Sequence, residues 1–173
     1  MKETIGILVK NHPGVLSRIA GLFTRRGYNI ASIAAGVTED PKYTRITIVA
    51  EGDKRTLDQI VHQLNKQLDV IKVIVLGRDE SVRRELALIK IEVKSSMERL
   101  EIIEIANTFR ANVVDIGKKM ITTEVTGPTE KINAFISLMS EFGIKEIART
   151  GKIALSRGPM SIREEKEDIK WEE

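Results

Sequence analysis

Hydrophobic residues recur along the first half of the chain in two alternating patterns. Short runs rich in β-branched residues, some alternating with polar residues, predict strands at 4–9, 28–37, 43–50 and 70–76. Between them, apolar residues at three- and four-residue spacing predict two helices. The first begins at Val15 and ends before Gly27, and the second carries Leu57 to Leu68 on its inner face. The predicted order is therefore βαββαβ.

The same order begins again in the second half of the chain. Strand patterns cover 86–93, 112–116, 120–126 and 144–155, the last bent near Gly151. One helix starts near Met97 with Leu100 on its expected inner face, and another starts just after Pro128, a residue common at helix starts. The repeat indicates two structural units of similar length.

These patterns predict the fold class and the domain organisation. The class is α+β, with two tandem ferredoxin-like βαββαβ units over residues 1–78 and 83–158. The acidic tail, 159–173, is predicted to be disordered. Each unit should place both helices on one face of its sheet and leave the other face bare. Because a bare, partly apolar sheet face usually finds another surface, we predict a homodimer joined through sheets or sheet edges.

The composition excludes several functions. The net charge of +3 is too small to indicate nucleic-acid binding, and the predicted central strands lack the base-stacking aromatic residues of the RNA-binding βαββαβ fold. The absence of cysteine excludes disulfides and thiolate metal sites and agrees with a cytoplasmic location. No apolar run approaches the roughly 20 residues of a membrane span. The N-terminus leads directly into a strand, so no signal peptide is expected.

No catalytic or metal-binding constellation is recognisable. The two histidines, His12 and His62, have no partner at metal-ligand spacing. No serine has the G-x-S-x-G setting of a nucleophile, and no phosphate-binding glycine motif occurs. The sequence therefore favours a chain that is not an enzyme and holds no metal or cofactor of its own.

The segment from Asn11 to Leu16, between the first strand and the first helix, suits a small zwitterion. Gly14 allows a ligand to approach the backbone, and unpaired N–H groups at the helix start favour a carboxylate. The Asn11 side-chain oxygen or a backbone carbonyl can accept from an ammonium group. Small residues of the next strand leave space for a modest apolar side chain: Ala31, Ala34, Ala35 and Gly36. Asn, Pro and Gly are also ordinary turn residues, so a plain turn is the alternative interpretation.

The stretch from Asn11 to Ile30 resembles the start of the ACT domain in the small subunits of acetolactate (acetohydroxyacid) synthase. Its most specific part is Arg-Arg-Gly-Tyr-Asn-Ile at 25–30. The likeness continues through 84–90 and 148–158, and it covers the chain except for the tail. The resemblance implies that 1–78 is an amino-acid-binding ACT domain.

The resemblance also implies a function. The chain is expected to be the regulatory, non-catalytic subunit in the first shared step of branched-chain amino acid synthesis. It would activate a catalytic subunit that carries thiamine diphosphate, Mg and FAD, and would confer feedback inhibition by valine. In this family valine lies between two ACT domains. Its loop contacts correspond to Asn11, Gly14, Val15 and Leu16 of one chain, and its partner contacts to Asn29 and Ile30 of the other.

Two alternatives stay open at the level of sequence. An ACT-type amino-acid sensor could regulate a different enzyme, and leucine or isoleucine could be the effector, because one apolar pocket discriminates poorly among these side chains. The residues of the second unit indicate no ligand.

Overall fold

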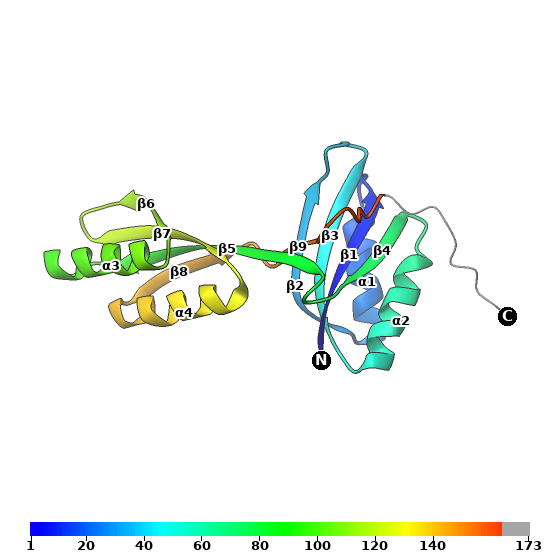
Figure 1. The fold of residues 1–173 in the computed structure, drawn as a ribbon, viewed down its shortest axis with the longest axis horizontal. Coiled ribbons are helices and arrows are strands. Elements are labelled where there is room, and N and C mark those ends of the chain that lie inside the picture. Colours follow the sequence, from blue (N-terminus) through cyan, green and yellow to red (C-terminus); the bar gives the residue numbers. More distant parts are fainter. Residues whose placement is uncertain (164–173) are drawn as a thin grey trace. The chain divides into compact units, whose positions relative to one another are not determined.

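The structure, a computed structural model, describes residues 1–163, which form two compact units (Figure 1). The first comprises residues 1–82 together with the segment that begins at Ala154, and the second comprises Arg83–Ile153. The sequence prediction places residues up to 158 in the second unit, whereas in the structure the second unit ends five residues earlier, at Ile153. Residues 164–173 of the predicted tail lie outside the described residues.

The first unit is a four-stranded antiparallel sheet with two helices on one face. The strands lie in the order β2-β3-β1-β4. The elements are β1 Lys2–Lys10, α1 Val15–Arg26, β2 Asn29–Val37, β3 Tyr43–Glu51, α2 Lys54–Asn65 and β4 Val70–Leu76. Alternate strand residues face the helices because successive side chains point to opposite faces of a sheet. These residues, with Ile19, Phe23, Ile60 and Leu64 of the helices, form a buried hydrophobic core.

The ends of the helices follow local sequence signals. α1 ends at Gly27, which takes the left-handed conformation (φ 66°) common at this position. α2 begins after Asp53, whose carboxylate accepts a 2.7 Å hydrogen bond from the backbone N–H of Thr56. Hydrogen bonding from Thr56 lowers the pKa of Asp53. Because α2 already stops at Asn65, Leu68 lies beyond the helix and is 91% exposed, so its predicted inward position is wrong.

The second unit repeats this architecture. Its main strands lie in the order β6-β7-β5-β8, equivalent to the order in the first unit, and β9 also pairs with β5. The elements are β5 Ser81–Glu92, α3 Ser96–Thr108, β6 Asn112–Ile116, β7 Met120–Gly127, α4 Thr129–Met139, a 3-10 turn Ser140–Phe142 and β8 Ile144–Arg149. β9, Ile153–Ser156, begins at the last residue of this unit and continues into the segment that belongs to the first. The predicted fold class, two tandem ferredoxin-like units, is confirmed. The single bent strand predicted at 144–155 is instead two strands, separated at Gly151.

The position of Leu100 on α3 differs from the sequence prediction. Ile102 and Ala106 are fully buried, whereas Leu100 is 64% exposed. Residues two positions apart on a helix point about 200° apart, so Ile102 and Leu100 cannot both face the sheet. The apolar residues of α3 are spread over nearly all sides of the helix, so their spacing does not identify the inner face.

The helix-free face of the first sheet, expected to be bare, is partly covered by the C-terminal segment 154–163. Arg45 of β3 donates from Nη2 to the carbonyl of Ala154 at 2.9 Å. Arg157 donates its backbone N–H to the carbonyl of Glu80 at 2.8 Å. Arg163 pairs with Glu39 at 2.8 Å. A cavity of about 230 Å³ remains under the segment, lined in part by Leu8, Arg45, Leu155 and Met160.

Gly6 leaves room for Arg45 on this face. A Cβ at Gly6 would lie 3.1 Å from Arg45 Nη2, 3.2 Å from Ile74 Cγ1 and 3.3 Å from Leu76 Cδ1. We expect Gly6→Val to lower the free energy of unfolding by about 1–3 kcal/mol in urea titrations, because it overpacks the face and displaces the guanidinium from Ala154. The loss should be smaller in an Arg45→Ala background. Strictly additive losses in the double variant would contradict this account.

Candidate functional site

The loop from Asn11 to Gly14 leaves the start of α1 uncapped. Gly14 is the N-cap residue and is left-handed (φ 88°, ψ −10°), so it provides no side-chain oxygen, and no acidic residue lies in the first turn. Within residues 1–163, the backbone N–H groups of Leu16 and Ser17 have no hydrogen-bond acceptor. Free N–H groups and the helix dipole together favour an anion at this position.

Asn11 is held at the edge of this helix start by two hydrogen bonds. Its backbone N–H donates to the carbonyl of Lys42 at 2.7 Å. Its side-chain Nδ2 donates to the carbonyl of Pro41 at 2.8 Å. This bond uses one of the two N–H groups of the amide and fixes its orientation, and the side-chain oxygen remains to accept from a ligand. An ammonium group is a donor of the matching kind.

A network of polar side chains fixes the loop from the other side. His12 Nε2 lies 2.8 Å from Asp69 Oδ1, and Arg18 Nη1 lies 3.1 Å from Asp69 Oδ2. Arg18 Nη2 lies 3.8 Å from the point where a Cβ of Gly14 would stand. Asp69, which is 14% exposed, thus joins the loop to the first turns of α1. Sequence reasoning missed this network because Asp69 is distant along the chain and no motif links it to His12.

The other predicted site residues differ in how they face this loop. Leu16 is half exposed, whereas the side chain of Val15 is buried in the core, so only the backbone of Val15 can meet a ligand. Asn29 and Ile30 begin β2 at the opposite end of the sheet. Asn29 pairs with Glu51 and the last residue of β1 pairs with Tyr43, eight residues apart on β3, or about 26 Å. One chain therefore does not bring Asn29 and Ile30 to the loop.

The start of β2 has its own contacts. Asn29 Nδ2 donates to Glu51 Oε2 at 3.0 Å, and Lys2 pairs with the other oxygen of Glu51 at 2.7 Å. These hydrogen bonds, from Lys2 first and then Asn29, lower the pKa of Glu51. β2 is an edge strand, and its apolar residues Ile33 and Val37 are exposed. The strand thus presents both backbone groups and apolar side chains for pairing.

The equivalent helix of the second unit, α3, has a side-chain cap at its start. Ser95, the N-cap residue of α3, accepts from the N–H of Glu98 at 3.1 Å, and the Glu98 carboxylate accepts from the N–H of Lys94 at 2.8 Å. This reciprocal capping places a negative charge in the first turn. A carboxylate ligand would meet an anion at the start of α3, whereas the start of α1 carries neither a side-chain cap nor an acidic residue.

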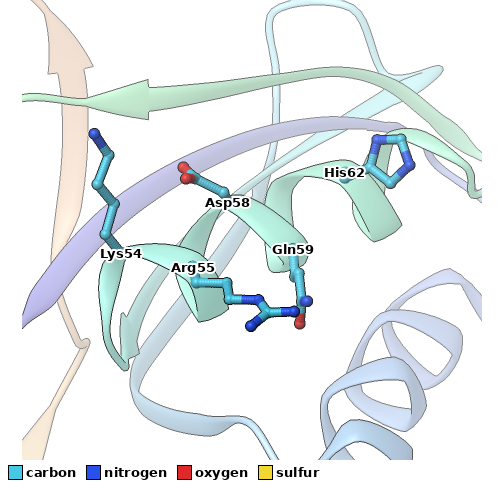
Figure 2. A pocket seen from close by; sticks show the side chains of 5 residues that line it. All are labelled: Lys54, Arg55, Asp58, Gln59 and His62. Atoms are coloured by element: carbon cyan, nitrogen blue, oxygen red, sulfur yellow. The ribbon is translucent and has the colours of Figure 1, made fainter.

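A second surface depression, of about 540 Å³, follows the exposed side of α2 (Figure 2). It is lined by Lys54, Arg55, Asp58, Gln59 and His62, and Figure 2 shows that these side chains do not converge on one point. In the part of the chain that the structure describes, no three His, Asp or Glu side chains are grouped to hold a metal ion. None of the helices within residues 1–163 has the length and apolar character needed to cross a bilayer.

The fold and the loop together define an ACT-type chain. Residues 5–72 match the family described as the AHAS (acetohydroxyacid synthase) small subunit-like ACT domain, and residues 84–158 match the family described as the small subunit of acetolactate synthase. A crystal structure of the acetolactate synthase small subunit from Thermotoga maritima superposes with a TM-score of 0.86 at 36% identity, covering 92% of this chain and 99% of that one.

Sequence relatives agree with this class. A probable acetolactate synthase small subunit of Methanothermobacter thermautotrophicus is 53% identical over 91% of this chain and 94% of its own length. The acetolactate synthase small subunit of Mycobacterium bovis is 46% identical over 92% of this chain and 95% of its own length. The chain belongs to the family of acetolactate synthase small subunits.

Proposed function

We propose that this chain is the non-catalytic regulatory subunit of an acetolactate synthase, and that valine bound at the α1 start adjusts the activity of the catalytic subunit. The observation that carries the proposal is the uncapped helix start beside an oriented Asn11. In the absence of valine the chain raises the activity of the catalytic subunit. That partner holds the thiamine diphosphate, Mg and FAD.

The loop matches the three parts of valine. The carboxylate accepts hydrogen bonds from the free N–H groups of Leu16 and Ser17, where the helix dipole adds to the attraction. The ammonium group donates to the side-chain oxygen of Asn11. The isopropyl group contacts the half-exposed side chain of Leu16 and the small residues of the β2 edge.

The site is completed by a second copy of the chain. β2 is an exposed edge, and antiparallel pairing of β2 with the same strand of a second copy places the start of one strand beside the end of the other. Val37, the end of β2, lies at the same end of the sheet as Asn11, since Val37 pairs with Thr44 and Lys10 pairs with Tyr43. Asn29 and Ile30 of the second copy thereby reach the loop.

Inhibition follows from linkage between the binding of valine and the binding of the catalytic subunit. Valine bound between two copies favours one arrangement of the dimer, and that arrangement binds the catalytic subunit less productively. Coupling free energies of about 1–3 kcal/mol change the partner's affinity by several-fold to about a hundredfold. By reciprocity, the catalytic subunit changes the affinity for valine by the same factor.

Thermal melts of the purified chain with each amino acid in turn test the proposal. Valine at about 100 times its Kd should add roughly 2.7 kcal/mol to the free energy of unfolding, with smaller effects of leucine or isoleucine and none of other amino acids. Valine should also lower acetolactate formation by the catalytic subunit only when this chain is present. Stabilisation by an unrelated amino acid alone would instead identify a sensor for a different enzyme, and no response in either assay would refute the proposal.

A further inference from the structure

Arg45 of β3 is a half-buried cation that no carboxylate of the described chain neutralises. It pairs with Leu8 of β1 across the sheet, and both side chains lie on the helix-free face. Its guanidinium donates one hydrogen bond, from Nη2 to the carbonyl of Ala154 at 2.9 Å. Within residues 1–163 no carboxylate lies within ion-pair distance of Arg45, and its Nε is buried without an acceptor. The protein therefore leaves the charge and one donor of this side chain uncompensated.

This uncompensated charge is unfavourable where it lies. Burial lowers the pKa of the Arg45 guanidinium, and no neighbouring anion opposes that effect. Arginine keeps its proton in proteins, so the group does not become neutral, and buried charges are usually paired. An anion from outside the chain that reached the guanidinium would be the missing partner.

The space for such an anion is the cavity of about 230 Å³ beneath the C-terminal segment. This volume is below the roughly 300–1,000 Å³ of pockets for drug-sized ligands, so it suits a molecule of few heavy atoms. Arg45, Arg163 and Glu39 are the charged residues that line it. Because Arg163 pairs with Glu39 at 2.8 Å, Arg45 is the unbalanced charge among the three. Apolar side chains form much of the remaining wall: Leu8, Leu155, Met160 and Ile162.

We propose that this cavity binds a small aliphatic monocarboxylate. Its carboxylate accepts from the Arg45 guanidinium, and its alkyl part packs against Leu8 and Leu155. An amino acid fits less well, because the Glu39 carboxylate that an ammonium group would need is already engaged by Arg163. The ligand contacts both the sheet and the C-terminal segment, so it holds the segment on the sheet.

This site is separate from the valine loop and does not depend on the proposed function. Ile7 and Val9 of β1 pack in the core with α1, whereas Leu8, between them, faces the other side of the sheet and lines the cavity. The cavity and the start of α1 thus lie on opposite faces. An Arg45→Met chain should keep its valine response, so the two sites can be tested independently.

Isobutyrate, a branched monocarboxylate without an ammonium group, is the probe for the full chain. Thermal melts and the NMR signal of the Arg45 Nε–H group should both show saturable binding. The amide of Arg157, bonded to the carbonyl of Glu80 at 2.8 Å, should exchange more slowly when isobutyrate is bound. Isobutyramide has the same shape without the charge, and sodium chloride matches the ionic strength. Equal effects of either compound overturn the proposal.

Two substitutions locate the binding. Arg45→Met should weaken isobutyrate binding about tenfold or more, since it removes a hydrogen bond between charged groups. Ser156→Asp adds a carboxylate to the cavity wall, so this chain should fold and bind no isobutyrate. Arg99→Met is the matched control, because Arg99 of α3 also donates to backbone carbonyls, those of Gly117 and Lys118. Full affinity in Ser156→Asp, or a loss in Arg99→Met as large as in Arg45→Met, refutes the site.

Discussion

A Gly14→Asp chain is expected to fold and to lose its response to valine completely. Gly14 has φ 88°, a left-handed conformation that costs a residue with a side chain about 1–2 kcal/mol, and Asp tolerates it better than most residues. The new carboxylate would lie at the free helix start and accept the same N–H groups that the ligand carboxylate needs. Two anions cannot share this position. Valine should then neither raise the melting temperature nor lower the activity of the catalytic subunit.

Gly158→Asp is the matched control for this substitution. Gly158 is also left-handed (φ 70°), and a Cβ there meets nothing within 4 Å, but the residue lies outside the loop. We expect a comparable loss of stability in urea titrations and an unchanged valine response. If both variants lose the response equally, the effect comes from backbone strain or general destabilisation rather than from the helix start. If Gly14→Asp still binds valine at the original affinity, the loop is not the site.

An equimolar mixture of Asn11→Ala and Asn29→Ala chains is expected to recover about a quarter of the valine sites, although neither variant binds well alone. Each substitution removes a hydrogen bond to a charged group, worth about 1.5–3 kcal/mol, so each lowers affinity by roughly ten- to hundredfold. In a randomly mixed population about half of the dimers are mixed. One of the two sites in such a dimer has both asparagines intact. Calorimetry after subunit exchange counts the high-affinity sites.

Asn112→Ala provides the control for the asparagine substitutions. Asn112 begins β6 of the second unit and donates to Glu124 at 3.3 Å, as Asn29 begins β2 and donates to Glu51. This variant should keep full valine affinity. A mixture that recovers no sites would show that the two asparagines do not meet across a dimer. Wild-type affinity in Asn29→Ala alone would remove Asn29 from the site.

The architecture could be predicted from the sequence because the local signals agree with the packing. Alternating β-branched strands and capped helices indicate each βαββαβ unit, and strands such as 70–76 and 112–116 match the structure to the residue. The predictions for Leu68 and Leu100 are wrong for different reasons. Leu68 follows the end of α2, which has no strong stop signal, and Leu100 lies on α3, which is apolar on nearly every side. Tertiary packing decides both positions.

The candidate site could be predicted only where its chemistry is local. Gly14 and the helix start lie within one short segment, so the uncapped N–H groups follow from the sequence. The network of His12, Arg18 and Asp69 depends on residues that only the fold brings together. The sequence likewise contains no signal that Arg45 reaches the carbonyl of Ala154, because such a contact requires the C-terminal segment to return to the first sheet.

That return makes the first unit discontinuous along the chain. Proteins are synthesised from the N-terminus, and domains generally fold as units as they emerge. Residues 1–82 leave the ribosome early, but Ala154, which Arg45 contacts, leaves only after all of Arg83–Ile153. The helix-free face of the first sheet, with Leu8 and Arg45, is thus uncovered during most of synthesis. Completion of the first unit therefore waits for the last part of the chain to be made.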